Sequence, residues 1–164
     1  MRFAVAACLV LLAAPARAES GQSGVWTYTY EPSSSGSGGI VTALSPSPGA
    51  DPNDPSYLIA RCLGGRTELL VGGAGGWGMP RRKLEVTTAI DDAPPETAPW
   101  DVSTNGKAVF LDDGVEPFLK KLPDDGRLRI SIKDATGALR ENIFATKGFG
   151  LVRDKIAKAC GWAK

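Results

Sequence analysis

Three acidic side chains, those of Asp91, Asp112 and Glu116, are the ones in this sequence that could carry hydrolytic chemistry. Such chemistry needs two carboxylates held apart across a cleft. Asp91 and Asp112 each begin an Asp-Asp pair close to glycine or proline, where aspartate more simply closes a turn or caps a helix. The chain also contains no histidine, which removes the commonest general base and the usual serine and cysteine triads. We therefore expect no catalytic residue and no enzymatic activity.

Metal and cofactor sites are not expected either. Segment 51–54 offers two aspartates and an asparagine, but the prolines around them and a missing glutamate break the calcium-loop pattern. Segment 73–78 matches G-x-G-x-x-G after a strand, as a dinucleotide fingerprint requires. Pro80 and a strand-like segment follow, however, where that fingerprint needs a helix. A glycine-rich loop is the simpler interpretation.

Aromatic and basic side chains provide the candidate binding residues. The tryptophans, which could form a platform for a glycan or a small ligand, are Trp26, Trp77, Trp100 and Trp162. Three of them adjoin strands or the last helix and favour the core, whereas Trp77 lies in the glycine-rich loop and should be exposed. The basic run 81–83 is either the solvent-exposed start of a strand or a contact for an acidic partner. The candidate binding residues are Trp77, Trp100, Arg81 and Arg82.

The first 18 residues have the composition of a secretory signal peptide. Arg2 precedes an apolar run over residues 3–14, and Ala16-Arg17-Ala18 supplies an A-x-A cleavage signal. The run is too short to cross a membrane, and no second long apolar segment follows. We therefore expect cleavage after Ala18 and a soluble mature protein, with no transmembrane segment, in the periplasm or outside the cell.

The charge balance bears on the partner. The chain has 19 Lys and Arg against 18 Asp and Glu, and removal of Arg2 and Arg17 with the leader keeps the mature protein close to neutral. Near-neutrality argues against nucleic acid or an anionic membrane as the main partner.

Cysteine usage points to a disulfide bond. Cys8 lies in the predicted leader, which leaves Cys62 and Cys160 in the mature chain. Two cysteines in an exported protein have one intramolecular pairing, and an oxidising compartment favours it. The alternative is a reactive or metal-binding thiol pair, which the absence of histidine and of a C-x-x-C spacing disfavours. A bridge between these cysteines could contribute roughly 4 to 5 kcal/mol on the chain-entropy model.

The central predicted element is a β-hairpin over residues 57–71, turned by Gly64-Gly65. This turn sets Leu63 opposite Arg66 and Arg61 opposite Glu68, an ion pair on one face. The other face is predicted to be the core side, and it carries Leu58, Ala60, Cys62, Thr67, Leu69 and Val71.

The remaining chain alternates strand patterns with turns and ends in an amphipathic helix. Further strands are predicted over 25–30, 40–44, 84–90, 100–103, 107–111, 127–133 and 139–146. A short helix is predicted over 115–122 and a longer one over 149–160, whose apolar stripe includes Cys160. Segments 31–39 and 45–56, rich in serine, proline and glycine, are expected as flexible loops.

These elements predict one β-rich α+β domain over residues 19–164. We expect an antiparallel sheet of about seven or eight strands, curled towards a sandwich or a barrel, with a short internal helix. The C-terminal amphipathic helix should lie on the sheet and bring Cys160 to Cys62.

The order of several short motifs carries a family resemblance. The motifs are L-x-x-R-C at 58–62, T-E-L-x-V at 67–71, I-D at 90–91, W-D-V-S at 100–103, A-V-F at 108–110, F-x-x-x-G-F-x-x-V at 144–152 and C-G-W at 160–162. In this order the chain from Trp26 to Trp162 resembles the VasI/TagO-like family of exported proteins associated with bacterial type VI secretion. Ala89 stands where that family has an arginine. The resemblance implies a periplasmic accessory protein with no catalytic residues to carry over.

Three functions follow from these expectations. The first is an exported, non-enzymatic envelope protein that binds another envelope protein. The second is a periplasmic glycan or small-ligand binding protein that uses Trp77 and Trp100. The third, and least favoured, is a hydrolase that uses the carboxylates named above.

Overall fold

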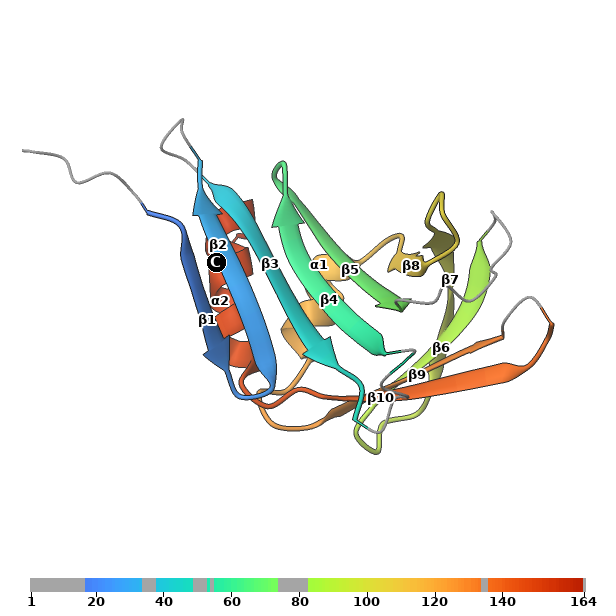
Figure 1. Cartoon of the computed structure of the whole chain (residues 1–164). Helices are drawn as coiled ribbons and strands as arrows, with labels where there is room; N and C mark the ends of the chain where they lie inside the picture. Colours follow the sequence, from blue (N-terminus) through green and yellow to red (C-terminus); the bar gives the residue numbers. More distant parts are fainter. Residues whose placement is uncertain are drawn as a thin grey trace, which may run out of the picture.

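The computed structural model describes residues 17–33, 38–48, 53, 55–73, 83–133 and 136–163. Within these residues, ten strands form one antiparallel sheet in the order β1-β2-β3-β4-β5-β8-β7-β6-β9-β10 (Figure 1). The strands are β1 (Glu19–Ser23), β2 (Trp26–Pro32), β3 (Gly39–Pro46), β4 (Ser56–Leu63), β5 (Arg66–Gly73), β6 (Leu84–Ile90), β7 (Glu96–Val102), β8 (Ala108–Leu111), β9 (Arg127–Lys133) and β10 (Leu139–Ala145). The described helices are α1 (Val115–Lys121) and α2 (Phe149–Cys160).

The sheet is larger and more open than the sequence predicts. Ten described strands replace the expected seven or eight, and the sheet does not close into a barrel or split into a sandwich. Figure 1 shows β1 to β5 as one layer, from which the sheet turns through β8, β7 and β6 until β9 and β10 cross its end. There β10 approaches β3 and not the opposite edge strand β1, so β1 and β2 project beyond the point of contact.

Strand β1 has no counterpart in the sequence prediction. Its residues, ESGQS, are polar and show no apolar alternation, so their sequence gives no strand signal. The strand exists through its pairing with β2, in which Gly21 lies opposite Tyr28 and beneath its phenol ring. Tertiary pairing therefore decides its conformation, and local propensity does not.

The central hairpin forms as predicted. Gly64 and Gly65 have φ angles of 58° and 77°, the positive values that a tight two-residue turn requires. The predicted register holds from Leu63 opposite Arg66 to Leu58 opposite Val71. On the outer face, Arg61 Nε lies 2.6 Å from the Glu68 carboxylate.

Helix α2 covers the inner face of the first half of the sheet. It packs against β2, β3 and β4, and α1 packs against β5 (Figure 1). The predicted disulfide bond between Cys62 and Cys160 is present, with the two Cα atoms 5.6 Å apart. The start of α2 is capped from another segment, because the Asp124 carboxylate accepts a hydrogen bond from the Gly150 N–H. The helix is thus fixed at both ends.

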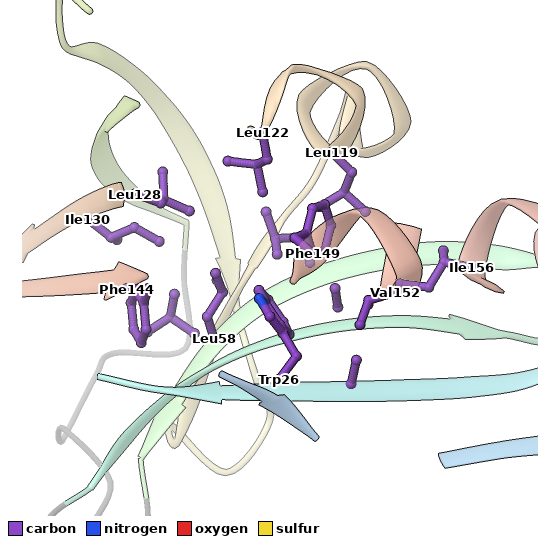
Figure 2. Packing of buried hydrophobic residues seen from close by; sticks show 14 of the residues in the cluster. Trp26, Leu58, Leu119, Leu122, Leu128, Ile130, Phe144, Phe149, Val152 and Ile156 are labelled. Carbon is purple, nitrogen blue, oxygen red and sulfur yellow. The ribbon is translucent and has the colours of Figure 1, made fainter. Parts of the chain in front are cut away.

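A single hydrophobic core joins both halves of the sheet to both helices. Trp26 and Phe149 lie at its centre with their ring centroids 5.0 Å apart (Figure 2). The fully buried side chains around them come from every part of the fold, and they include Leu58, Leu119, Leu122, Leu128, Ile130, Phe144, Val152 and Ile156. Because these residues are shared between the layers, neither half of the sheet has a separate core.

The prediction of a loop over 45–56 is wrong at both ends, where the structure has strands. Ser45 belongs to β3 and Ser56 to β4, and both are buried, as is Ser47. The Ser47 hydroxyl donates to the Ile143 carbonyl of β10 at 3.1 Å, and the Ser45 hydroxyl donates to the Ala145 carbonyl at 3.4 Å. These serines satisfy carbonyl groups that an edge strand would otherwise leave unpaired, and this is why they are buried in spite of their polarity. The loop expected over 31–39 is likewise shorter, since β2 runs to Pro32 and β3 starts at Gly39.

Replacement of Ser47 by alanine should therefore destabilise the protein by about 1 kcal/mol, because it leaves the Ile143 carbonyl of β10 without its hydroxyl donor. Urea denaturation measures the loss, and amide exchange should quicken in the second half of β10. The matched control is Ser20→Ala, at an exposed position of β1, which should change the free energy of unfolding by less than about 0.5 kcal/mol. Equal losses in the two variants would contradict the role of Ser47.

The first turn of the fold docks on the segment before α2. The Val25 N–H donates to the Lys147 carbonyl at 3.1 Å, and the Ser23 hydroxyl donates to the Gly148 carbonyl at 2.8 Å. A Cβ atom at Gly24 or at Gly148 would overlap the backbone of the opposite segment, and both residues have positive φ. Glycine is therefore required at both positions of this contact.

Candidate functional site

The sequence-predicted binding residues do not assemble into a described surface. Trp77, Arg81 and Arg82 lie outside the described residues. Trp100 is 1% exposed and belongs to the core, so its assignment to a ligand platform is wrong. Its position beside a predicted strand already favours the core, and the pairing of β7 with β6 and β8 places its ring there.

The other two described tryptophans are also unavailable for a platform. Trp26 is fully buried against Phe149. Trp162 is half-buried, and its Nε1–H donates to the Thr67 hydroxyl at 2.7 Å. This bond ties the residues after α2 to the central hairpin, next to the disulfide bond.

The three carboxylates considered for hydrolysis each have a structural partner. The Asp91 carboxylate accepts a hydrogen bond from the Arg127 N–H at 2.8 Å, and Glu116 lies 2.7 Å from the Lys120 amine. Asp112 pairs with Lys83, whose hydrogen bond holds the pKa of the Asp112 carboxyl below its ordinary value. The three residues thus stabilise a turn, a helix and a strand end. Among the described residues, no group of three or more Asp, Glu or Cys side chains is placed to hold a metal ion.

A broad hollow on the described surface lies where three distant segments meet, and we call it the hairpin-tip groove. Its volume is about 970 Å³. It lies between the end of β2 and the start of β3, the Leu63–Gly65 turn of the central hairpin, and the last turn of α2. Figure 1 shows the tips of β2 and β4 at the same end of the sheet, with α2 behind them. The Cys62–Cys160 disulfide bond fixes the helix end that forms one wall of the groove.

Two exposed aliphatic side chains distinguish the lining of the groove. Ile40 is 38% exposed and Leu63 is 41% exposed. They lie on neighbouring strands, because Val41 is the register partner of Cys62. Glu31 and Lys158 add one charge of each sign, and at the glycines 64, 65 and 161 no neighbouring atom covers the main chain. Such a surface suits a polypeptide segment that offers apolar side chains and main-chain hydrogen bonds.

Few polar side chains line the groove. They are the Glu31 carboxylate, the Ser33 hydroxyl and the Lys158 amine, and Cys160 is held in the disulfide bond. The exposed aliphatic pair is therefore the feature of the lining that favours binding. Sequence reasoning missed this site because its parts come from three separate stretches of the chain, within 31–40, 63–65 and 158–161, although the predicted pairing of Cys62 with Cys160 already brought two of them together.

A second cluster of polar contacts holds the N-terminal edge strand to α2. The Lys155 amine lies 3.0 Å from the Glu19 carboxylate and 4.7 Å from the centre of the Tyr28 ring. The Tyr28 hydroxyl donates to the same carboxylate at 2.9 Å. The Lys155 and Tyr28 hydrogen bonds hold the pKa of the Glu19 carboxyl below its ordinary value, and the bond to Glu19 raises the pKa of Lys155. This cluster fixes the first described strand to the last described helix.

The lowered pKa of Glu19 predicts a pH-dependent attachment of β1. A carboxyl with a lowered pKa in the folded state stabilises the fold above its unfolded pKa, and this stabilisation is lost as the pH falls through the folded value. We expect the urea midpoint of the wild type to fall more steeply than that of Glu19→Gln on acidification from about pH 6 to about pH 3. Parallel curves for the two proteins would contradict the contribution of Glu19.

Comparison with known proteins finds a solved structure with a similar fold. No protein-family model and no curated protein matches the sequence. Among solved structures, the chain is similar to the crystal structure of invasion associated protein B from Bartonella henselae, with a TM-score of 0.52 and 12% sequence identity. The match covers 84% of this chain and 94% of the Bartonella chain. At that identity the likeness concerns architecture, and it extends over nearly the whole of the Bartonella protein. The chain therefore shares its fold with invasion associated protein B.

Proposed function

We propose that this chain is an exported envelope protein that acts by binding another protein through the hairpin-tip groove and catalyses no reaction. The observation that carries the proposal is the exposed pair Ile40 and Leu63 in the hairpin-tip groove. Large aliphatic side chains gathered at the rim of a hollow favour a protein contact, because their burial on binding is favourable.

Two further features support export. The disulfide bond between Cys62 and Cys160 is typical of proteins in oxidising compartments. Strand β1 begins at Glu19, directly after the cleavage site expected at Ala18, so removal of the leader would leave every described strand intact. Neither described helix has the length and hydropathy needed to cross a bilayer.

Within this proposal, we assign the protein an accessory role in an envelope process. Two of the motifs shared with the VasI/TagO-like family, L-x-x-R-C and C-G-W, contribute to the wall of the hairpin-tip groove or lie directly beside it. We propose that the groove is the part of the chain that serves this accessory role, in a type VI secretion system or in a related envelope process. The name of the Bartonella neighbour, which associates that protein with invasion, agrees with a role at the cell envelope.

The test is a capture experiment with matched groove and control variants. The full chain, expressed with its leader and a C-terminal tag, is recovered from periplasm together with its bound proteins, and the same is done for Leu63→Asp and Leu151→Asp. Both residues are exposed leucines, but only Leu63 lines the groove. We expect one envelope protein to accompany the wild type and Leu151→Asp and to be lost from Leu63→Asp. Recovery of the same proteins with all three chains would overturn the proposal.

A further inference from the structure

The outer face of the sheet, which points away from α2, carries an apolar row across its middle strands (Figure 1). Each residue of the row is the register partner of the next, and the row consists of Leu44 of β3, Ile59 of β4, Leu70 of β5 and Phe110 of β8. Leu44, Ile59 and Phe110 stay partly exposed, and none of the four belongs to the hydrophobic core. The outer face of an antiparallel sheet is commonly polar, so this row suits a further layer of structure.

The same face carries a second row, nearer to the tips of the hairpins. Ile40 and Leu63, the exposed pair of the hairpin-tip groove, lie in its middle on neighbouring strands. Glu31 of β2 is the register partner of Ile40. Arg66 of β5 is the register partner of Leu63. Across β2 to β5 the row therefore reads acid, apolar, apolar, base.

The two charges at the ends of this second row are free. Glu31 and Arg66 are exposed, and neither side chain has a hydrogen bond or an ion pair among the described residues. Segment 34–37, which follows Glu31 in the sequence, consists of serine and glycine and adds no charge. The other two outward charges of these strands, Arg61 and Glu68, are paired with each other at 2.6 Å. The outer face of β2 to β5 is thus neutral, with one free charge of each sign.

We infer that this face binds the same face of a second copy of the chain, about a two-fold axis that runs parallel to the strands between β3 and β4. Such an axis places β2 of each copy over β5 of the other and β3 of each over β4 of the other. Glu31 of each copy then faces Arg66 of the other, and Ile40 faces Leu63. The two sheets would lie about 10 Å apart, as in a β-sandwich.

The order of side chains in the rows favours a second copy over other occupants. A row that reads acid, apolar, apolar, base is complementary to itself after this rotation, so one chain supplies both halves of every contact. The same rotation sets Leu44 of each copy over Ile59 of the other, so the first row is covered as well. A nucleic acid or an anionic membrane needs an excess of cations, which this neutral face lacks.

The dimer would cover Ile40 and Leu63, which also line the hairpin-tip groove. Self-association and capture of another protein should therefore compete, and this one consequence rests on the proposed function. Arg66 does not line the groove, so a change at Arg66 alters the dimer and leaves the groove itself intact. Arg66→Glu should capture the partner of the groove at least as well as the wild type, and weaker capture would contradict the competition.

Charge reversal tests the two-fold contact. The chain is recovered from periplasm, and its association is measured by sedimentation velocity over a range of concentrations. We expect a dimer of the wild type, and at least about tenfold weaker association of Glu31→Arg and of Arg66→Glu, because each change sets like charges against each other at both ends of the row. Both positions are exposed, so neither change disturbs the core.

A mixture of the two variants makes the test specific. Equal amounts of Glu31→Arg and Arg66→Glu should associate as tightly as the wild type, because every contact between the two chains again joins opposite charges. Arg129→Glu, which makes the same change of charge at an exposed position of β9, is the matched control and should associate like the wild type.

Three results would overturn the inference. They are a wild type that stays monomeric at every concentration, a dimer that both charge reversals leave as tight as that of the wild type, and a mixture of the two variants that stays monomeric. A monomeric wild type whose capture is still lost in Leu63→Asp would remove the inference and leave the proposed function intact. A dimer restored in the mixture, without any Leu63-dependent capture, would do the reverse.

Discussion

The double variant Cys62→Ala/Cys160→Ala is expected to unfold with a free energy about 4 to 5 kcal/mol lower than that of the oxidised wild type. The reason is the length of chain that the bond closes, since the two cysteines are 98 residues apart in sequence. Without the bond, the unfolded chain regains the freedom of that long loop. Such a loss is a large part of the stability of an ordinary domain.

The measurement is urea denaturation of the wild type, the double variant, and the wild type kept reduced. Reduction removes the bond and leaves the residues in place, so the reduced protein separates the effect of the bond from that of the substitutions. Oxidised and reduced wild type that unfold at the same urea concentration would contradict the prediction.

The same experiment should show where the fold loosens first. The start of α2 remains held by the Asp124 cap and by the burial of Phe149 and Val152. The end of the helix loses its covalent anchor, and the hydrogen bond from Trp162 to Thr67 remains as its link to the central hairpin. Amide exchange should therefore quicken at residues 157–162 before it quickens at 149–153.

The second large effect is expected from Phe149→Ala, with a loss of about 3 to 5 kcal/mol. Phe149 is fully buried at the centre of the core, 5.0 Å from Trp26 between ring centroids (Figure 2). Its removal leaves a cavity that residues from two layers cannot easily fill, because both the sheet and α1 are fixed around it.

Leu151→Ala is the matched control for this prediction. Leu151 lies two residues further along α2 and is exposed, so its truncation should cost less than about 0.5 kcal/mol. Urea denaturation of the two variants measures the difference. Comparable losses would mean that α2 does not dock through the face that carries Phe149.

Elements with a strong apolar period could be predicted from the sequence closely. The bounds of β6, β9 and α2 agree with the predicted ranges, because each has one buried face and a repeat that matches its geometry. The central hairpin and the disulfide bond follow from Gly64-Gly65 and from the cysteine content. These features depend on local chemistry, which the sequence contains directly.

Features that depend on distant pairing could not be predicted. Strand β1 has no apolar period and forms only because β2 is beside it. The sequence around Ser45 and Ser47 predicts a loop, and only the contact with β10 shows why these serines are buried. The number of strands and the open form of the sheet follow from these same pairings, which explains why the predicted sheet was too small and too closed.

The candidate site was the least predictable part. Trp100 was named as a candidate binding residue, although its place beside a strand favours the core, and it lies in the core. The hairpin-tip groove combines residues from β2, the central hairpin and α2, none of which carries a motif for binding.

The contacts between the beginning of the chain and α2 also set the order in which the protein can fold. Glu19 pairs with Lys155, Gly24 meets Gly148, and Cys62 bonds to Cys160. A ribosome makes the second member of each pair last, so the inner faces of β1 to β5 stay uncovered until α2 has been synthesised. For a chain that must remain unfolded until it has crossed a membrane, as we propose, this delay keeps it competent for translocation.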